Sequence, residues 1–572
     1  MKLMNTGMKK LAISAMAVAV CTATAYGGGH VRKKIIALGW DVMWATPAQL
    51  LERSDEFGKT GIAGMVPTLF GELADGTKIS PRRLMHEPPW TEEAFEKDGG
   101  IWTELLKKPG FTESFAGPLR MPIKRVAWTD DAWWKRVEGN MRVFGKVTKK
   151  FGFRGIELDH EDYPGGKPFV RRPDDLPFKE LTLIVRRRAK EMFTPFFEEF
   201  PDAVLFGCRF FSVDPDFWNY YYRSPDPVAR AEKWGDLWPA FVNGILDAMP
   251  MTARILEGDE TGYRYMAKRH EFFKAYARLN QKLNPLIAPE NRQKYRAVSQ
   301  VAFPVYLDMY SAWDPKSRYY RGPENGSRAA HCEMNLSEAV DASDEYTWVY
   351  GERASWVHWP TPPDKRAPLA HKTWDELMPG LYDVLHAKTD PSGYAHRRFA
   401  RLNDAEKAAN RLKGFLDRAA AGFKKPGTYA LKSLPRPFHG WQGREQPGTF
   451  GVCRLEDGSA AFYAEGVGRG GILFADEKLS HGDYCLIAFR AKGPLSETII
   501  RLRRQSGVDD LVEPTWTVPE GKEGADGWRL IAYMFRIPDD CIGIMTSACM
   551  KQRPGERTLL RDFYLAPVLK MK

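Results

Sequence analysis

The chain has 572 residues, of which 43% are hydrophobic and 13% aromatic, and its formal charge at pH 7 is +11. This length and apolar content are enough for at least two domains with their own cores. The mild positive charge, with no Lys/Arg run longer than Arg186–Arg188, argues against nucleic acid as a partner. It is compatible with an anionic partner such as a sulfated or uronate-containing polymer.

Residues 1–25 have the features of a secretory signal peptide. Two lysines precede an apolar run over residues 11–20, and an A-x-A cleavage site ends at Ala25. The run is too short to cross a bilayer, and no other segment is long and apolar enough to be a membrane span. Cys21 raises the possibility of a lipoprotein, but a lipobox has a small residue just before its cysteine and this chain has Val20 there. We therefore expect cleavage after Ala25, a secreted or periplasmic protein, and a formal charge of +8 once three lysines are removed.

Six cysteines remain after this cleavage, and their spacing is not typical of a metal site. They are Cys208, Cys332, Cys453, Cys485, Cys541 and Cys549. An oxidising compartment would allow disulfides between them but does not require any. We expect neither a metal nor a cofactor.

From about residue 31 to residue 360, apolar strand-like runs alternate with amphipathic helical stretches. We expect strands over 35–41, 61–66, 124–128, 155–159, 203–211, 254–257, 298–309 and 346–350, and helices that include 131–151 and 178–200. This alternation indicates parallel strands with helical crossovers, and eight such runs fit an α/β fold of the (β/α)8 TIM barrel type. A doubly wound open sheet is the alternative, but the glycine-rich phosphate turn typical of one is absent.

The run Gly155–Asp159 leads into the most acidic stretch of this region. In an extended strand, Ile156 and Leu158 face one side while Glu157, Asp159 and Glu161 face the other. Three ionised carboxylates on one face repel one another, so they suit a polar cleft in which their pKa values are pushed apart. The alternative is a surface edge strand with a solvated acidic face.

Acidic and aromatic side chains recur at the expected carboxyl ends of the strands, where barrel enzymes carry their active sites. Surface turns and helix caps would scatter such residues over both ends. The candidate substrate-binding residues are Asp41, Trp44, Trp128, Tyr163, Arg209, Glu257, Tyr263, Tyr306, Asp308, Tyr350 and Trp356.

Two carboxylates that flank a bond, with aromatic platforms around them, are the arrangement needed for glycoside hydrolysis. Glu161 is the expected proton donor, because Asp159 on the same face would raise its pKa by repulsion. Glu352 is the expected partner, with Glu260 as its competitor. Each has a simpler reading: Glu352 beside Arg353 suits a surface ion pair, and Glu260 ends an acidic turn that would suit a cation.

The segment Phe153–Glu161, followed by Tyr163-Pro164, resembles the strand-four signature of chitinase-like glycoside hydrolases. This resemblance implies that Glu161 is the catalytic acid and Asp159 its helper. The chain lacks the glycine-rich strand-three motif and the Met-x-Tyr-Asp strand-six motif of those chitinases, which argues against substrate-assisted chemistry. More broadly, the signal peptide and the acidic strand ends resemble exported glycosidase-type barrels.

After the expected barrel domain, 31–423, the character of the sequence changes. Segments 373–387 and 404–423 predict helices that brace the barrel, and 424–427 predicts a linker. Short β-rich runs separated by Gly, Pro and Asp then indicate an antiparallel β-sandwich of jelly-roll type over 428–572. This part resembles carbohydrate-binding modules, although a sandwich that packs on the barrel without binding sugar is equally compatible.

The sequence thus predicts an exported glycoside hydrolase that acts on a carbohydrate, possibly an anionic one. A non-catalytic glycan-binding barrel is the alternative from another class, because a fold does not fix a function. A polysaccharide lyase or an esterase is a further alternative, although the chain has no Gly-x-Ser-x-Gly elbow.

Overall fold

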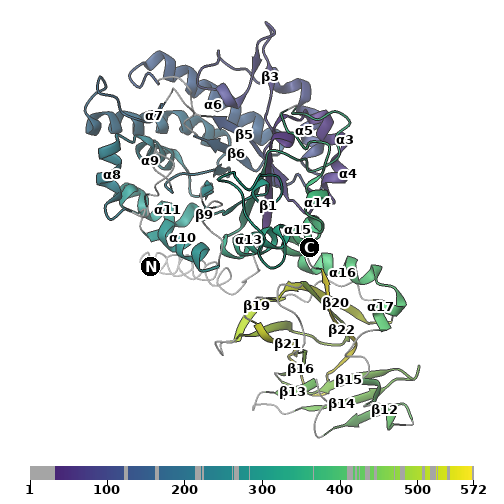
Figure 1. Cartoon of the computed structure of the whole chain (residues 1–572). Helices are drawn as coiled ribbons and strands as arrows, with labels where there is room; N and C mark the ends of the chain where they lie inside the picture. Colours follow the sequence, from purple (N-terminus) through teal and green to yellow (C-terminus); the bar gives the residue numbers. More distant parts are fainter. Residues whose placement is uncertain are drawn as a thin grey trace, which may run out of the picture. The chain divides into compact units, whose positions relative to one another are not determined.

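The chain forms two compact units, Lys33–Pro391 and Ser392–Val568. The computed structural model (Figure 1) describes residues 32–120, 126–160, 167–212, 221, 224–260, 262, 269–281, 284–364, 366–408, 416–418, 421–423, 425–431, 438–442, 448–468, 470–476, 484–504, 509–515, 524, 526–537 and 541–569. The expected signal peptide lies outside these residues. None of the helices described is long and apolar enough to span a membrane.

The first unit contains two parallel sheets. The five-stranded sheet has the order β5 (Phe115–Arg120), β6 (Gly155–Asp159), β7 (Val204–Gly207), β8 (Arg254–Glu257) and β9 (Ser299–Val301). The four-stranded sheet has the order β10 (Pro304–Tyr306), β11 (Tyr346–Gly351), β1 (Lys34–Gly39) and β2 (Gly64–Met65). All of these neighbours pair in parallel. Within each sheet neighbouring strands follow one another along the chain, except where β11 pairs with β1.

The two parallel sheets meet at both of their edges. Beside β2, the carbonyls of Ala63 and Pro67 accept backbone hydrogen bonds of 3.1 Å from Glu113 and Gly117, which flank the start of β5. At the other edge, only two residues separate β9 in one sheet from β10 in the other. The parallel order of strands therefore continues from each sheet into the next.

Helices connect successive strands and lie outside them in Figure 1. The longer ones are α5 (Glu96–Leu105), α6 (Asp131–Phe151), α7 (Phe178–Glu199), α8 (Pro227–Trp234), α9 (Trp238–Ala248), α10 (Arg269–Gln281), α11 (Arg292–Val298), α13 (Arg328–Ala342) and α15 (Leu381–Thr389). Shorter elements are α2 (Trp40–Trp44), α3 (Pro47–Glu52), α4 (Ser54–Phe57), α12 (Asp308–Ser311), α14 (Trp374–Leu377), the 3₁₀ turn η1 (Pro81–Arg83) and the β3–β4 hairpin (Gly71–Glu72 and Lys78–Ile79).

Helix α6 has the expected bounds because both of its ends carry sequence signals. The Asp130 side chain caps its N-terminus by accepting a hydrogen bond from the Trp133 amide, and Gly152 ends it in the left-handed conformation.

Seven of the eight expected strand runs coincide with strands of the structure, and the third does not. Residues 126–128 of the expected 124–128 strand are not a strand, and 124–125 lie outside the described residues. The strand at this position is β5, whose register with β6 shifts between Ala116 and Leu119. The intervening Gly117-Pro118 reads as a turn in the sequence, since proline has no amide to donate to a sheet. The prediction for this strand was wrong for that reason.

The second unit is an antiparallel β-sandwich. One sheet has the order β12 (Gly427–Ala430), β14 (Thr449–Arg454), β15 (Ala460–Glu465), β22 (Arg557–Leu569), β17 (Tyr484–Lys492) and β20 (Arg529–Arg536). The other has the order β13 (Phe438–Gln442), β16 (Gly470–Asp476), β21 (Cys541–Met550), β18 (Glu497–Arg504) and β19 (Asp509–Thr515). Both sheets contribute to one apolar core, which includes Phe462, Ile487 and Phe563 from the first sheet and Ile472 and Ala548 from the second.

The units divide at residues 391/392, before the linker expected at 424–427. Helix α16 (Pro391–Arg401) packs on the sandwich: the His396 ring contacts the Leu530 carbonyl at 2.9 Å, and Phe399 packs edge-on against Tyr564. Helix α17 (Asp404–Ala408) follows it. The helices expected to brace the barrel are therefore split. Helices α14 and α15, which overlap the expected 373–387, are in the first unit, whereas α17, at the start of the expected 404–423, is in the second.

Replacing Gly155 by Ala is expected to prevent folding of the first unit. A Cβ atom at this position of β6 would lie 1.8 Å from the Val204 carbonyl oxygen, which the neighbouring strand holds in place. We expect the free energy of unfolding to fall by about 3 kcal/mol or more. Gly139 is the matched control, because on the exposed face of α6 its added Cβ meets no atom within 4 Å. Gly139→Ala should instead add up to about 1 kcal/mol. Denaturant titration measures both, and equal stability of the two variants would contradict this account.

Candidate functional site

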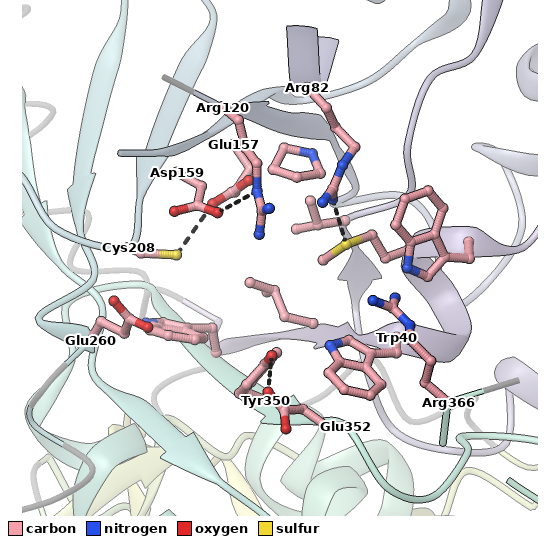
Figure 2. Close-up of a pocket in the computed structure, with 16 residues that line it drawn as sticks. Trp40, Arg82, Arg120, Glu157, Asp159, Cys208, Glu260, Tyr350, Glu352 and Arg366 are labelled. Carbon is pink, nitrogen blue, oxygen red and sulfur yellow. Dashed lines mark hydrogen bonds and ion pairs between the residues drawn. The ribbon is translucent and has the colours of Figure 1, made fainter. Parts of the chain in front are cut away.

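A cavity of about 410 Å³ lies at the carboxyl ends of the parallel strands of the first unit (Figure 2). Its lining residues lie at or just beyond the ends of β1, β2, β5, β6, β7, β8 and β11, together with two loop arginines and part of α2. They are Leu38, Trp40, Met43, Trp44, Val66, Arg82, Pro118, Arg120, Glu157, Asp159, Cys208, Glu260, Trp348, Tyr350, Glu352 and Arg366. Four carboxyl groups, three guanidinium groups and four aromatic rings thus share one cavity.

Strand β6 presents two acids to the cavity, as the alternation in its sequence predicts. Ile156 and Leu158 are fully buried on the other face, while Glu157 and Asp159 line the cavity. Asp159 forms an ion pair with Arg120 at the end of the neighbouring strand β5, with an Nε–Oδ2 distance of 3.0 Å.

Glu157 has a different environment from Asp159, although it lies only two residues away. Its Oε1 accepts a hydrogen bond of 3.2 Å from the Cys208 thiol, and its Oε2 has no partner among the described residues. Burial raises the pKa of Glu157 well above its ordinary value, and repulsion from Asp159 adds to this rise. Two carboxyls of this strand therefore have different environments: one is buried beside a thiol and the other is paired with a guanidinium.

Glu157→Gln should reduce the dependence of stability on pH. Because the pKa of Glu157 is raised in the folded state, its contribution to stability is full below its ordinary pKa of 4.5 and is lost as pH rises towards the folded value. As pH rises above about 4.5, the unfolding temperature of the parent should therefore fall more steeply than that of the variant. Glu180→Gln, on the exposed surface of α7, is the control and should keep the parental slope. Identical slopes for all three proteins would show that Glu157 is ionised when folded.

Glu260 enters the cavity from the loop after β8. Its carboxylate lies 3.1 Å from Nη1 of Arg209, and this arginine is almost fully buried. The Glu260 amide donates to the Cys208 carbonyl at 2.9 Å, which holds the loop against the end of β7. Arg209 thus holds the Glu260 carboxylate at the edge of the cavity, and Arg209 itself does not line the cavity.

Glu352 follows β11 and lines the same cavity. The Tyr350 hydroxyl donates to its Oε1 at 2.6 Å, and its amide donates to Oδ2 of Asp308 at 2.7 Å. Asp308 is fully buried, and burial raises its pKa to about 7. The Tyr306 ring packs against that of Tyr350, with centroids 5.1 Å apart. Asp308 and Tyr306 therefore support Glu352 and Tyr350 and are not themselves part of the cavity lining.

Two further acids expected to bind substrate are buried away from the cavity. Asp41 accepts a hydrogen bond of 2.8 Å from the Trp356 amide, and burial raises the pKa of Asp41 to about 6. Glu257 accepts hydrogen bonds from the amides of Phe210 and Phe211 that follow β7, and burial raises its pKa. Both carboxyls hold strand-end loops together, which explains acids at these positions without a bound substrate.

The expected aromatic platforms are divided in the same way. Trp44 lines the cavity. Trp128 packs in the core against Trp134, with ring centroids 5.4 Å apart, and Trp356 is buried against Tyr382. Glu161, Tyr163 and Tyr263 lie outside the described residues.

The cavity also contains residues that the sequence analysis did not single out as site residues. They are chiefly Arg82, Arg120, Arg366 and Trp348; Glu157, expected on the acidic face of its strand, and Trp40, at the first strand end, also line the cavity. Arg120 is the last residue of β5, the strand that was not predicted. A correct prediction of β5 would have placed Arg120 among the strand-end candidates. Arg82 comes from the 3₁₀ turn η1 and Arg366 from a loop. Neither belongs to a periodic sequence pattern that would predict its place in the cavity.

Among the residues that the structure describes, no group of three or more His, Cys, Asp or Glu side chains is arranged to hold a metal ion. Cys208, Cys332, Cys453, Cys485 and Cys549 are buried, and the structure shows no disulfide at these five.

No family model and no curated protein matches the chain. Among solved structures, the chain is similar to the enzymatically active domain of tailspike protein 4 of bacteriophage CBA120, with 13% identity over 23% of this chain and 20% of that one and a TM-score of 0.20. It is also similar to the C-terminal family 22 carbohydrate binding module of Clostridium thermocellum Xyn10B, with 13% identity, 25% of this chain, 92% of the module and a TM-score of 0.18. A third likeness is to the family 11 carbohydrate-binding module of the cellulase Lic26A-Cel5E of Clostridium thermocellum, with 14% identity, 26% of this chain, 98% of the module and a TM-score of 0.16. We draw no functional conclusion from likenesses at these TM-scores.

Proposed function

We propose that the protein is a glycoside hydrolase that cleaves a poly- or oligosaccharide by a two-carboxylate mechanism. The observation that carries this proposal is the set of four carboxyl groups in one cavity, which have different environments. Burial raises the pKa of Glu157 well above its ordinary value, whereas Asp159 and Glu260 are paired with arginines. Carboxyl groups in different environments are what acid and base roles at a glycosidic bond require.

The roles follow from where the acids lie. Glu161, which follows Asp159 by two residues in the sequence, is the proposed proton donor to the leaving oxygen, and Asp159 assists it. Glu352 on the other side of the cavity is the proposed nucleophile or base, and Tyr350 holds its Oε1. Glu260 is the alternative in this role, although its ion pair with Arg209 makes it a weaker nucleophile. Trp40 and Trp348, which line the cavity, offer apolar faces for a sugar ring.

We propose further that the two parallel sheets form a single (β/α)8 TIM barrel. Backbone hydrogen bonds from Glu113 and Gly117 to the residues flanking β2 support closure at one edge. The two-residue connection between β9 and β10 supports closure at the other edge. With β9 and β10 counted as one bent strand, the circuit has the eight strands of that fold. A cavity at the carboxyl ends of the strands also suits it.

The remaining parts of the proposal concern export and attachment. We propose that residues 1–25 are removed on export to the periplasm or the exterior, and that the sandwich unit is a carbohydrate-binding module. The alternation of short strands and turns over 428–572 supports this role, and its two antiparallel sheets suit it.

Incubation with a panel of oligosaccharides tests the function. Hydrolysis should produce new reducing ends from at least one glycan and no ultraviolet absorbance from an unsaturated sugar. Absorbing products would instead indicate a lyase. Saturable binding of a glycan with no cleavage of any panel member would overturn the enzymatic proposal and favour a glycan-binding protein.

A further inference from the structure

Three guanidinium groups line the cavity, and two of them already have carboxylate partners. Arg120 is paired with Asp159, and Arg366 forms a fork-shaped pair with Asp364 through Nε distances of 2.9 and 3.0 Å. Arg82 differs from both. In the part of the chain that the structure describes, no carboxylate lies within ion-pair distance of its side chain.

The immediate contacts of Arg82 hold it in place without neutralising it. Its Nη1 donates to the Met43 sulfur at 3.0 Å, and its guanidinium lies over the Trp44 ring, 4.6 Å from the centroid. A thioether is a weak acceptor and a ring face takes no N–H, so most of the five guanidinium donors remain for another group. Burial lowers the pKa of Arg82 to about 10, and the side chain is therefore still charged at neutral pH. Asp159 and Glu157 favour the charged guanidinium from beyond ion-pair distance, whereas Arg120 and Arg366 oppose it, so a bound oxyanion would supply a direct partner.

A second donor beside Arg82 also lacks an acceptor. Nε1 of Trp44 is buried and has no hydrogen-bond partner among the described residues. The Arg366 guanidinium lies near the same ring, 5.7 Å from its centroid. Figure 2 shows Arg82 and Arg366 at the Trp40 side of the cavity, whereas Asp159 and Glu260 lie at the opposite side. Arg82 and Arg366 thus lie apart from Asp159 and Glu260, although Arg120 pairs with Asp159 and Glu352 lies near Tyr350.

We propose that Arg82 binds a negatively charged substituent, a carboxylate or a sulfate ester, on the sugar that occupies the cavity. This inference rests on the proposed function and specifies its substrate class. An oxyanion beside Arg82 would accept hydrogen bonds from its guanidinium and would supply a direct partner. The same binding mode would place the uncharged part of the glycan towards Asp159 and Glu260, where an anionic group would be repelled.

Calorimetric binding to matched oligosaccharides tests this proposal independently of catalysis. The ligands are a uronate-containing oligosaccharide, its carboxyl-reduced neutral counterpart and a sulfated analogue of the neutral one. The parent should prefer an anionic ligand to the neutral one. Arg82→Gln should weaken binding of that anionic ligand about 10- to 100-fold and leave the neutral ligand within about twofold. Arg82→Lys should restore part of the loss, because it keeps the charge but not the planar fork.

Arg83→Gln is the matched control, since it removes the same charge from the same turn but from a side chain that pairs with Glu87 and does not line the cavity. It should leave all three affinities unchanged. The uronate and sulfate ligands identify which oxyanion is preferred. Equal weakening of charged and neutral ligands by Arg82→Gln, or a parent that prefers the neutral ligand, would overturn the inference even if the protein cleaves glycans. Selective anionic binding without cleavage would uphold the inference and overturn the proposed hydrolysis.

Discussion

Replacing Glu352 by Gln is expected to lower turnover of the cleaved glycan about 10²- to 10⁴-fold while the fold is kept. The amide has the shape of the carboxylate and can still accept the 2.6 Å hydrogen bond from Tyr350, but it cannot attack or deprotonate. Initial rates measured by release of reducing ends, together with the unfolding temperature, separate catalysis from stability. Glu324→Gln, on the exposed surface of the same unit, is the control and should keep the parental rate.

Rescue by azide distinguishes Glu352 from its competitor Glu260. In a retaining enzyme, azide should restore turnover to the Gly variant of the true nucleophile and should give a glycosyl azide of inverted anomeric configuration. We expect rescue at position 352. The Glu260 variant must be compared through its unfolding temperature as well, because it leaves the buried Arg209 without its ion pair. Rescue at 260 and not at 352 would reverse the two roles, and rescue at neither would favour an inverting mechanism.

Local sequence signals account for the elements that were predicted well. Strand β6 and helix α6 have the expected bounds, because a capping aspartate, a terminal glycine and strict alternation are each set by neighbouring residues. Strand β5 was missed because Gly117-Pro118 carries a turn signal, and only its pairing with β6 makes the segment a strand. Pairing between segments far apart in sequence is not visible in a local pattern.

The candidate site was predicted less completely than the fold, for a related reason. The end of a strand shows that an acid is near the cavity, but not whether its side chain enters it. Asp41 and Glu257 instead accept hydrogen bonds from backbone amides of other loops. Partners that are distant in the chain cannot be predicted from the spacing of residues in the sequence. Arg82 was not predicted as a site residue because it comes from the turn η1 and not from a strand end. Its importance depends on the absence of a described counter-ion, which is a property of the folded cavity.

Glu161→Gln is expected to lower turnover about 10²- to 10⁴-fold for substrates with a poor leaving group, since a positioned general acid contributes about that much. The loss should be far smaller for aryl glycosides whose leaving phenolate needs no proton. Parallel kinetics on natural oligosaccharides and on such aryl glycosides measure this contrast. A similar loss on both kinds of substrate would mean that the residue does not donate the proton.

Comparing Glu157→Gln with Glu161→Gln shows which of the two residues is the general acid. Glu157 lines the cavity and its pKa is raised well above the ordinary value, so it is a second candidate for the donor. Its position inside β6, with one oxygen bonded to the Cys208 thiol, favours a supporting role. The Gln side chain keeps the shape of this group and should therefore affect both kinds of substrate equally and modestly. A large loss confined to the poor leaving groups in Glu157→Gln, but absent in Glu161→Gln, would assign the acid to Glu157.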